Sequence, residues 1–499
     1  MKDDSKNGLH AAEELTTNFV KLDDAKDTLG NATSKGHERL EAIDLFRGLI
    51  MVIMAWDHSK DFLANKKVPK DQGGSAWSGQ LGDFDHNFLL FFARFISHFC
   101  APGFFYTMGI SMFLFTKSRL FGKRWTKLRI IKHFMIRAFV LLVVGRLVDL
   151  AIIFQVIPVV LERKSFPILK IFGGSIWTIS FIGIWEVMTG LSYVMGITGF
   201  FIPYFVSYMH RKREKNKTNV GLKLLPLSIF IVGVLLFCFS NYTIVQAQNG
   251  DPCGPFCKDI ANNETVAVKW PRESSVAVGF WQIFLRYTLI PGRFSSGIII
   301  YPLIPWISIT LFGMVHGYGF SYNPEQAYAA ARYIGILCLG MFVLVRLYGK
   351  DGYLGNLRGL PRDGVQGDWL IAFLNVCKYP PSVAYALITL GVDLICLGAI
   401  QKLGNTCRCC TAPHRGKPTM PLVKRILFAY GKAPLFFYLI HFQVLGILSM
   451  VFHFFGNGFD LDLVPIPYFF VMVLMYFICK KYSKYKRSLG SESWVRNYL

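Results

Sequence analysis

The sequence predicts an all-α, polytopic membrane protein of about ten transmembrane helices. Of its 499 residues, 53% are hydrophobic and only 17% are charged, and the mean hydropathy is +0.38. A soluble protein of this length would carry more charge and fewer uninterrupted apolar runs. Apolar segments of roughly 20 residues, long enough to cross a bilayer, recur along the chain.

Three regions follow from this pattern. Residues 1–37 are polar without an apolar core, which predicts a disordered cytosolic tail. Residues 38–480 form the membrane domain, and residues 481–499 form a second cytosolic tail. The stretch 276–293 is apolar but contains Arg286 and Pro291, so we expect it to be interfacial or re-entrant. The expected helices lie near 43–60, 88–116, 134–156, 172–208 (long enough for two pieces), 225–247, 294–317, 327–347, 380–400, 424–452 and 465–479.

Loop charges predict the orientation of the chain. Segments 117–132, 210–217 and 480–487 are strongly basic, which is typical of cytosolic loops facing anionic lipid. This pattern explains the net charge of +23 better than nucleic-acid binding does. The connections 60–87, 248–275 and 348–368 have mixed charge and should lie outside, and the loop 401–423 and both termini should then be cytosolic.

Cysteines and a glycosylation pattern agree with this topology. The expected external loop 248–275 contains the acceptor triplet Asn263-Glu-Thr and the pair Cys253 and Cys257, which an oxidising compartment would allow to form a disulfide. The other cluster, Cys407-Arg-Cys-Cys410, lacks a second ligand pair at zinc spacing. We therefore expect no metal site and favour lipidation of Cys407, Cys409 and Cys410.

The first apolar segment carries a stripe of polar residues. Arg47 and His58 are eleven residues apart, about three turns, so both fall on nearly the same face, about 16 Å apart along the axis. Asp44 precedes Arg47 by one turn, and Asp61 follows His58 by one turn. Ionisable groups inside a membrane segment cost several kcal/mol unless they are paired or hydrated. Imidazole moves protons near neutral pH, so we expect His58 to be catalytic, with Asp57 or Asp61 orienting it.

The second apolar segment repeats the combination of arginine and histidine. Arg94 and His98 are four residues apart on one face, followed by Pro102, whose ring bends a helix and helps to shape a cavity. His98 therefore competes with His58 for the catalytic role. A lone histidine in a helix, such as His316 or His453, is more often a packed or interfacial residue than a catalyst. His58 and His98 each share a helix face with an arginine, however, which favours a catalytic role. Other polar residues in later apolar segments are Glu186, His316, Arg346, Asp393 and His441.

Several blocks in order resemble the transmembrane acyltransferase superfamily. The start Asp44-Leu-Phe-Arg-Gly48, ending in His58, matches an Arg–His pair of bacterial inner-membrane O-acyltransferases. The blocks Phe91–Pro102, Tyr301–Trp306, Phe373–Ser382 and Tyr430–His441 resemble an uncharacterised branch of the heparan-alpha-glucosaminide N-acetyltransferase catalytic-domain family. The resemblance covers about residues 38–450.

The resemblance implies an acyltransferase that moves an acyl group, usually acetyl, from coenzyme A to a luminal or extracytoplasmic acceptor, expected to be a sugar. A histidine would carry the acyl group or act as a base toward the acceptor. Arg47, Arg94 and Lys378 would contact the anionic groups of coenzyme A. In the heparan enzyme the catalytic histidine follows the first helix, where this chain has His86 at a different spacing.

The expected partners are membrane lipid, the acyl-CoA (acetyl-CoA) donor and a carbohydrate acceptor, without nucleic acid, and assembly into a homo-oligomer stays open. The main alternative is a transporter or channel for a small anion or lipid, whose intramembrane charges would line a conduction path. It predicts symmetry between two halves, which the sequence does not display. A membrane scaffold with internally paired polar residues is a third alternative.

Overall fold

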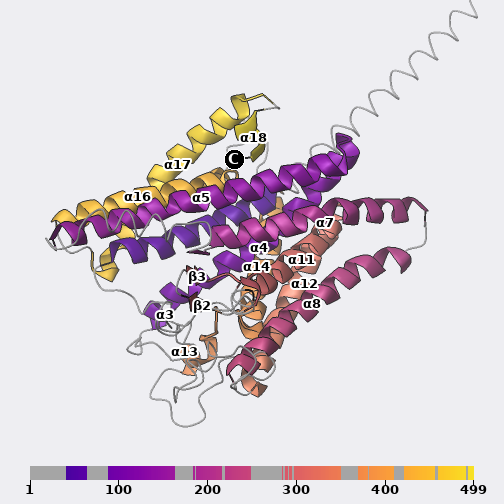
Figure 1. The fold of residues 1–499 in the computed structure, drawn as a ribbon, viewed down its shortest axis with the longest axis horizontal. Coiled ribbons are helices and arrows are strands. Elements are labelled where there is room, and N and C mark those ends of the chain that lie inside the picture. The colour runs from indigo at the N-terminus through magenta and orange to yellow at the C-terminus, as the bar shows by residue number, and fades with distance from the viewer. Residues whose placement is uncertain are drawn as a thin grey trace, which may run out of the picture.

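The structure, a computed structural model, is a bundle of long helices (Figure 1). It describes residues 41–64, 88–162, 184–185, 187–215, 220–248, 284, 287–289, 292–294, 297–349, 369–379, 381–409, 421–455, 459–490 and 493–498. The long elements are the first helix (residues 41–63), α4 (Cys100–Lys117), α5 (Lys127–Glu162), α7 (Val187–Lys215), α8 (Val220–Gln248), α11 (Leu303–Phe320), α12 (Pro324–Tyr348), α14 (Val383–Cys409), α16 (Pro434–Phe455) and α17 (Pro465–Ser488).

Shorter elements join these helices. They are α3 (Phe88–Phe95), a 3-10 turn η1 (Ile96–Phe99), a π-helical turn η2 (Ser118–Gly122), α13 (Trp369–Leu374), α15 (Leu422–Gly431), η4 (Leu461–Leu463) and the C-terminal α18 (Trp494–Tyr498). A small three-stranded sheet has the order β1-β3-β2, with β1 (Ile184–Trp185) parallel and β2 (Gly292–Phe294) antiparallel to β3 (Gly297–Ile299).

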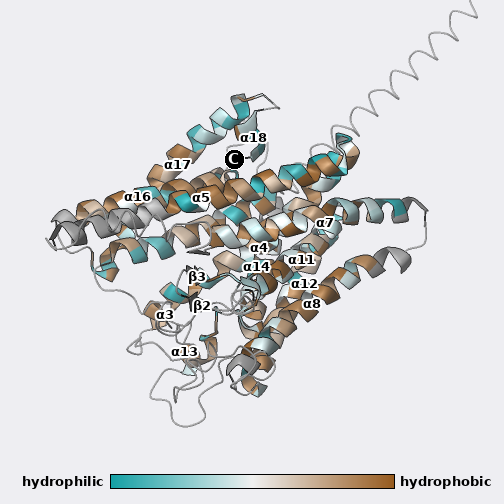
Figure 2. Ribbon diagram, in the orientation of Figure 1, coloured by the Kyte–Doolittle hydropathy of each residue, from teal (hydrophilic) through white to brown (hydrophobic). Residues whose placement is uncertain are grey.

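The all-α, multi-pass architecture predicted from the sequence is confirmed, but the count of ten spans is not. Among the described residues, eight helical spans are long and apolar enough to cross a membrane, and the ribbon in Figure 2 shows hydrophobic residues in brown. The first helix is not one of them, since it carries six acidic or basic side chains. These spans are Phe88–Gly122, Val187–Arg211, Leu225–Ile244, Leu303–Phe320, Pro324–Tyr348, Val383–Lys402, Pro434–Phe452 and Leu461–Ser488.

Two expected helices differ from the structure. The segment expected as one helix over 424–452 is two, because α15 ends at Gly431 and α16 begins at Pro434. The residue before a proline is pushed away from helical geometry, which explains the break. The helix expected from residue 294 begins at Leu303, because β2 occupies residues 292–294 and β3 occupies residues 297–299. β3 pairs with β1 more than a hundred residues earlier, a contact that local periodicity cannot reveal.

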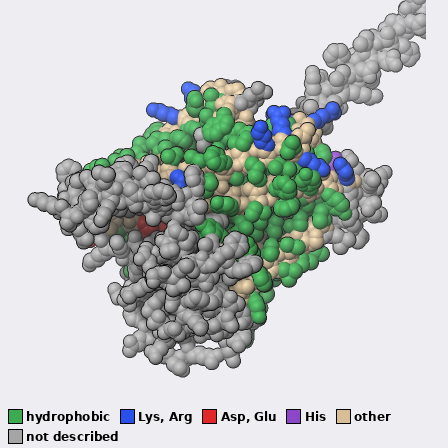
Figure 3. Space-filling view, viewed as in Figure 1, with side chains coloured by type: hydrophobic (Ala, Val, Ile, Leu, Met, Phe, Trp, Pro, Cys, Tyr) green, Lys and Arg blue, Asp and Glu red, His purple; other side chains and the backbone are tan. Residues whose placement is uncertain are grey.

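The basic segments gather at one end of the bundle, which we call the basic end. The rings of Phe121 and His210 are 3.7 Å apart, which joins the α4–α5 connection to the end of α7. The rings of His133 and Tyr498 are 5.0 Å apart, which brings the C-terminus to the same place. Figure 3 shows Lys and Arg side chains along the upper and right-hand edges of an otherwise apolar face. This grouping is what the loop charges predicted.

Several sequence predictions lie outside the described residues. These are the tail 1–37, His86, most of the apolar stretch 276–293, the external loop with Cys253, Cys257 and Asn263, and Cys410. The backbone of Cys407 and Cys409 belongs to the end of α14.

Glycines allow the helices that build the site to touch. A Cβ on Gly431 would overlap the Asp44 carbonyl oxygen, and a Cβ on Gly48 would overlap the Leu427 carbonyl oxygen. The first helix and α15 therefore meet backbone against backbone, as small residues permit in membrane proteins. An ion pair of 3.1 Å between Lys424 Nζ and Glu41 Oε2 closes the same crossing.

Replacing the buried Arg346 by lysine is expected to destabilise the fold. Its Nε and Nη2 atoms donate to the carbonyls of Phe373 and Ala372 at 2.8 and 2.7 Å, which ties α12 to α13. Lysine lacks the planar fork, so we expect a loss of about 1.5–3 kcal/mol. Thermal unfolding in detergent measures it. Leu337→Ala on the lipid-facing side of α12 is the control, and equal midpoints for the two variants would contradict the prediction.

Candidate functional site

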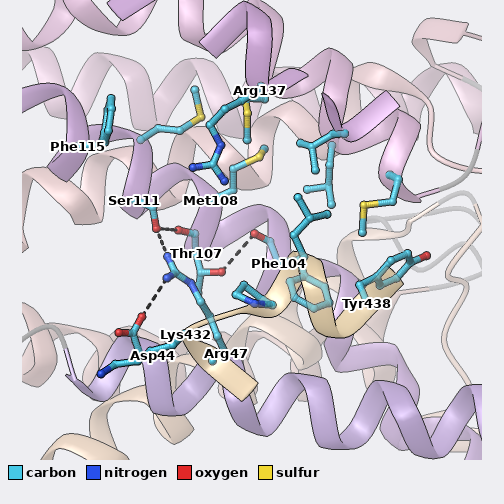
Figure 4. Close-up of a pocket in the computed structure, with 18 of the residues that line it drawn as sticks. Asp44, Arg47, Phe104, Thr107, Met108, Ser111, Phe115, Arg137, Lys432 and Tyr438 are labelled. Carbon is cyan, nitrogen blue, oxygen red and sulfur yellow. Dashed lines mark hydrogen bonds and ion pairs between the residues drawn. The ribbon is translucent and has the colours of Figure 1, made fainter. Parts of the chain in front are cut away.

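Arg47 joins the first helix to α4. Its Nη1 lies 3.1 Å from Asp44 Oδ1, one turn earlier in the same helix. Its Nη2 donates to the Ser111 hydroxyl oxygen, and that hydroxyl in turn donates to the Thr107 carbonyl at 2.6 Å. These bonds fix the direction of the guanidinium group (Figure 4).

A cavity of about 370 Å³ opens beside Arg47 (Figure 4). Its volume lies at the lower end of the range for small-molecule pockets. Its walls come from the first helix, α4, α5, α7, α16, α17 and the turn after α15. Much of its apolar wall is flexible thioether, contributed by Met51, Met108, Met112, Met188 and Met195. Methionine adapts to ligands of irregular shape, so this wall suits a flexible apolar chain.

The charged lining of the cavity is mostly positive. It contains four basic side chains, Arg47, Arg137, Lys432 and Lys486, and one acidic side chain, Asp44. Arg47 and Arg137 repel each other, since each lies within Coulombic range of the other. Partial burial lowers the pKa of the Lys432 ammonium, and the nearby Asp44 opposes that shift. A cavity with this surplus of positive charge favours an anionic ligand.

His58 forms a hydrogen-bonded pair with a residue far along the chain. Its Nδ1 lies 2.8 Å from His441 Nε2, and the two rings are stacked with centroids 5.1 Å apart. His441 is fully buried in α16, whereas His58 is half-buried. We call these two residues the histidine pair.

The hydrogen-bond network assigns the protons of the histidine pair. His441 Nδ1 lies 2.9 Å from the Phe437 carbonyl oxygen, which can only accept, so Nδ1 carries the proton. In neutral His441, Nε2 is then an acceptor, and His58 Nδ1 donates to it. His58 Nε2 is left with its lone pair as the basic and nucleophilic atom. This is the orientation that general-base or covalent catalysis needs.

Tyr438 connects the cavity to the histidine pair. Its ring lines the cavity and lies 6.2 Å from the His58 ring and 5.7 Å from the His441 ring, centroid to centroid. Met51, another lining residue, precedes His58 by two turns on the same face of the first helix. The described lining does not include His58 or His441, and Tyr438 is a lining residue whose ring contacts reach both members of the histidine pair.

Asp57 and Asp61 were predicted to orient His58, but neither takes part in the hydrogen bond that the structure describes for the His58 ring. Asp57 forms an ion pair with Lys60, at 3.0 Å between Oδ1 and Nζ, and Asp61 is exposed. In the hydrogen bond that the structure describes for the His58 ring, the partner is His441. His98 is buried on η1, where its ring packs between Phe95 and Tyr385 at 5.7 and 5.6 Å.

The three residues expected to hold coenzyme A do not lie together. Arg47 lines the cavity, whereas the buried residues Arg94 and Lys378 are not among the described lining residues. Lys378 lies within Coulombic range of His58. Arg94 belongs to α3, where the preceding carbonyl, that of Ala93, accepts from Lys60 at 2.9 Å. Arg94 is thus near the far half of the first helix.

Sequence reasoning gave His441 no role in the site, although it noted the residue as a polar group in an apolar segment. The signal was present, because His441 ends one of the blocks that carry the family resemblance. Arg137, Lys432 and Lys486 were missed because basic residues near helix ends are usually interfacial. Neither a known protein family nor a curated protein matches this sequence, so the resemblance stays a prediction that rests on the residues.

Proposed function

We propose that this chain is an integral-membrane acyltransferase that takes an acyl group, acetyl in the simplest case, from coenzyme A. The acceptor would lie on the opposite side of the membrane and would be a carbohydrate, as the family resemblance implies. The observation that carries the proposal is a cationic cavity whose lining residue Tyr438 lies 6.2 Å from the His58 ring of the histidine pair, centroid to centroid. Phosphates of the donor suit the cations, and the pantetheine arm suits the methionine-lined wall.

The chemistry follows from the proton positions. His58 Nε2 attacks the thioester carbonyl carbon, the carbon–sulfur bond breaks, and the His58 Nδ1 proton passes to His441 Nε2. The thiolate takes up this proton from His441 Nε2 and leaves as a thiol, so His441 is neutral again and His58 is a neutral acyl-imidazole. The hydroxyl or amine of the acceptor then attacks the acyl carbon, the bond from that carbon to His58 Nε2 breaks, and the proton that the acceptor loses returns to His58, so both histidines end the cycle neutral. In the one-step variant, His58 Nε2 removes the acceptor proton while the acceptor attacks the thioester directly.

The test is turnover by the purified full chain in proteoliposomes with acetyl-labelled acetyl-CoA and a panel of sugar acceptors. We expect release of free coenzyme A and transfer of label to a sugar. Label retained on the protein without acceptor would distinguish the covalent route from the one-step route. Flux of a small anion without coenzyme A release would favour the transporter, for which a positive cavity would also be suitable. Absence of both release and label transfer would refute the acyltransferase.

A further inference from the structure

We propose that a ring of cations at the mouth of the cavity binds the phosphates of the donor nucleotide, and that the C-terminal helix α18 completes this ring. The inference rests on the proposed function and adds a binding site to it. We call the ring the basic rim, and its members are Arg119, Arg129, Arg137, Lys486 and Arg496.

The C-terminal helix lies at the mouth of the cavity. The Tyr498 ring is 5.0 Å from the ring of His133, which lines the cavity. Arg496 lies within Coulombic range of Lys486, another lining residue. Its Nη1 donates to the Leu489 carbonyl at 2.8 Å, which ties α18 back to the end of α17.

The basic rim holds positive charges close together without an acidic partner. Arg119 lies within Coulombic range of Arg129 and Arg496, and Lys486 of Arg137 and Arg496. In the part of the chain that the structure describes, none of the five forms an ion pair with an acidic side chain. Like charges at this spacing repel, so an anion bound among them would be strongly favoured.

His133 supplies an independent sign of a ligand. It is 97% buried, since only 3% of its surface is exposed, and neither ring nitrogen has a hydrogen-bond partner among the described residues. Buried polar atoms are normally satisfied, so these nitrogens call for a group that the described residues do not provide. Phe115 stacks on the ring at 4.5 Å and keeps it in the cavity wall.

The geometry favours a nucleotide over a lipid headgroup as the source of the phosphate. Arg137 and Lys486 belong to the rim and also line the cavity. A phosphate bound there would direct an attached arm past the methionine wall toward Tyr438. Trp125 adds an aromatic surface at the rim, held by the guanidinium groups of Arg119 and Arg129 at 4.8 and 4.4 Å from its ring centre.

The first experiment measures equilibrium binding of adenosine 3′,5′-diphosphate to the full chain in phosphatidylcholine nanodiscs. We expect the wild type to bind and Arg496→Gln to weaken binding about tenfold or more, as loss of one charge-assisted phosphate contact predicts. Lys484→Gln removes an exposed charge from α17 outside the cavity lining and should change binding less than twofold. Arg129→Gln is a second rim variant, chosen because its side chain is also exposed.

The second experiment compares KM for acetyl-CoA with KM for acetyl-pantetheine, which lacks the nucleotide. Arg496→Gln should raise KM for acetyl-CoA alone. Nucleotide binding without acyl transfer would refute the proposed acyltransferase activity and would support the nucleotide site at the basic rim. If acyl transfer occurs and Arg496→Gln changes the KM of both donors equally, the acyltransferase activity stands and the nucleotide site at the basic rim is refuted. Binding of phosphatidylserine that depends on Arg496, with no nucleotide binding, would make the site a lipid site and overturn the inference.

Discussion

Replacing His58 by alanine is expected to lower acyl-transfer turnover by at least about 10³-fold, because the chain loses the atom that attacks the thioester or deprotonates the acceptor. Replacing His441 by alanine should cost about 10²–10³-fold, since His58 then loses both its orientation and its proton acceptor. Label retention on the protein should disappear with His58→Ala. Turnover is measured with acetyl-CoA in proteoliposomes.

A third variant separates positioning from proton transfer. Glutamine at 441 offers an amide oxygen that accepts the His58 Nδ1 proton in a hydrogen bond but cannot take that proton away. His441→Gln should therefore retain more activity than His441→Ala and should show a changed pH–rate profile. Equal losses in the two variants would mean that the hydrogen bond alone restores no activity, and would contradict a positioning role for His441.

The rival histidine provides the control. His98 packs between the rings of Phe95 and Tyr385, and its described ring contacts do not include the histidine pair or Tyr438, so His98→Gln should keep turnover within about tenfold of the wild type. Loss of activity in His98→Gln with activity retained in His58→Ala would transfer the catalytic role to His98. Full activity in both variants would refute histidine catalysis altogether.

Among the glycines that the structure describes, Gly431 is expected to be the one at which alanine is most damaging. Its Cβ would overlap the Asp44 carbonyl oxygen, so the first helix and α15 must separate. Overpacking of this kind costs about 1–3 kcal/mol or more. The same displacement would move Asp44 and Lys432, which line the cavity, so donor binding should also weaken. Thermal unfolding in detergent and acetyl-CoA KM measure the two effects.

Gly340 provides a matched control for this change. It lies within α12, and a Cβ there would meet open space. Alanine is the better helix former, so Gly340→Ala should be neutral or stabilise by roughly 0.5–1 kcal/mol. If Gly431→Ala unfolds at the same temperature as Gly340→Ala, the close crossing of the first helix and α15 is wrong.

The sequence predicted the helices well because a membrane allows few other solutions. Backbone groups in lipid must bond internally, so an apolar run such as 327–347 nearly dictates a helix, observed as Pro324–Tyr348. The break before Pro434 follows from the restriction that a proline places on the backbone of the preceding residue, which hydropathy alone does not show. The pairing of β1 with β3 depends on contacts distant in sequence, for which an apolar run carries no information.

Only part of the candidate site could be predicted from the sequence by such local rules. Arg47 and His58 could be placed on one face because helical geometry relates residues eleven positions apart. The partner of His58 could not, because 383 residues separate it from His441. Arg137 and Lys486 looked like ordinary interfacial cations, and only their convergence on one cavity with Arg47 gives them a role.

The distance along the chain between the two members of the histidine pair has a consequence for biosynthesis. At about 5–20 residues per second, a ribosome needs roughly 20–80 s to make the 383 residues that follow His58 up to His441. During that interval His58 is without its partner His441, whereas the partners of Arg47, Asp44 and Ser111, are made much earlier. A nascent chain halted before α15 should therefore be a target for membrane quality control, and the earliest segment of the protein should be among the last to become stable.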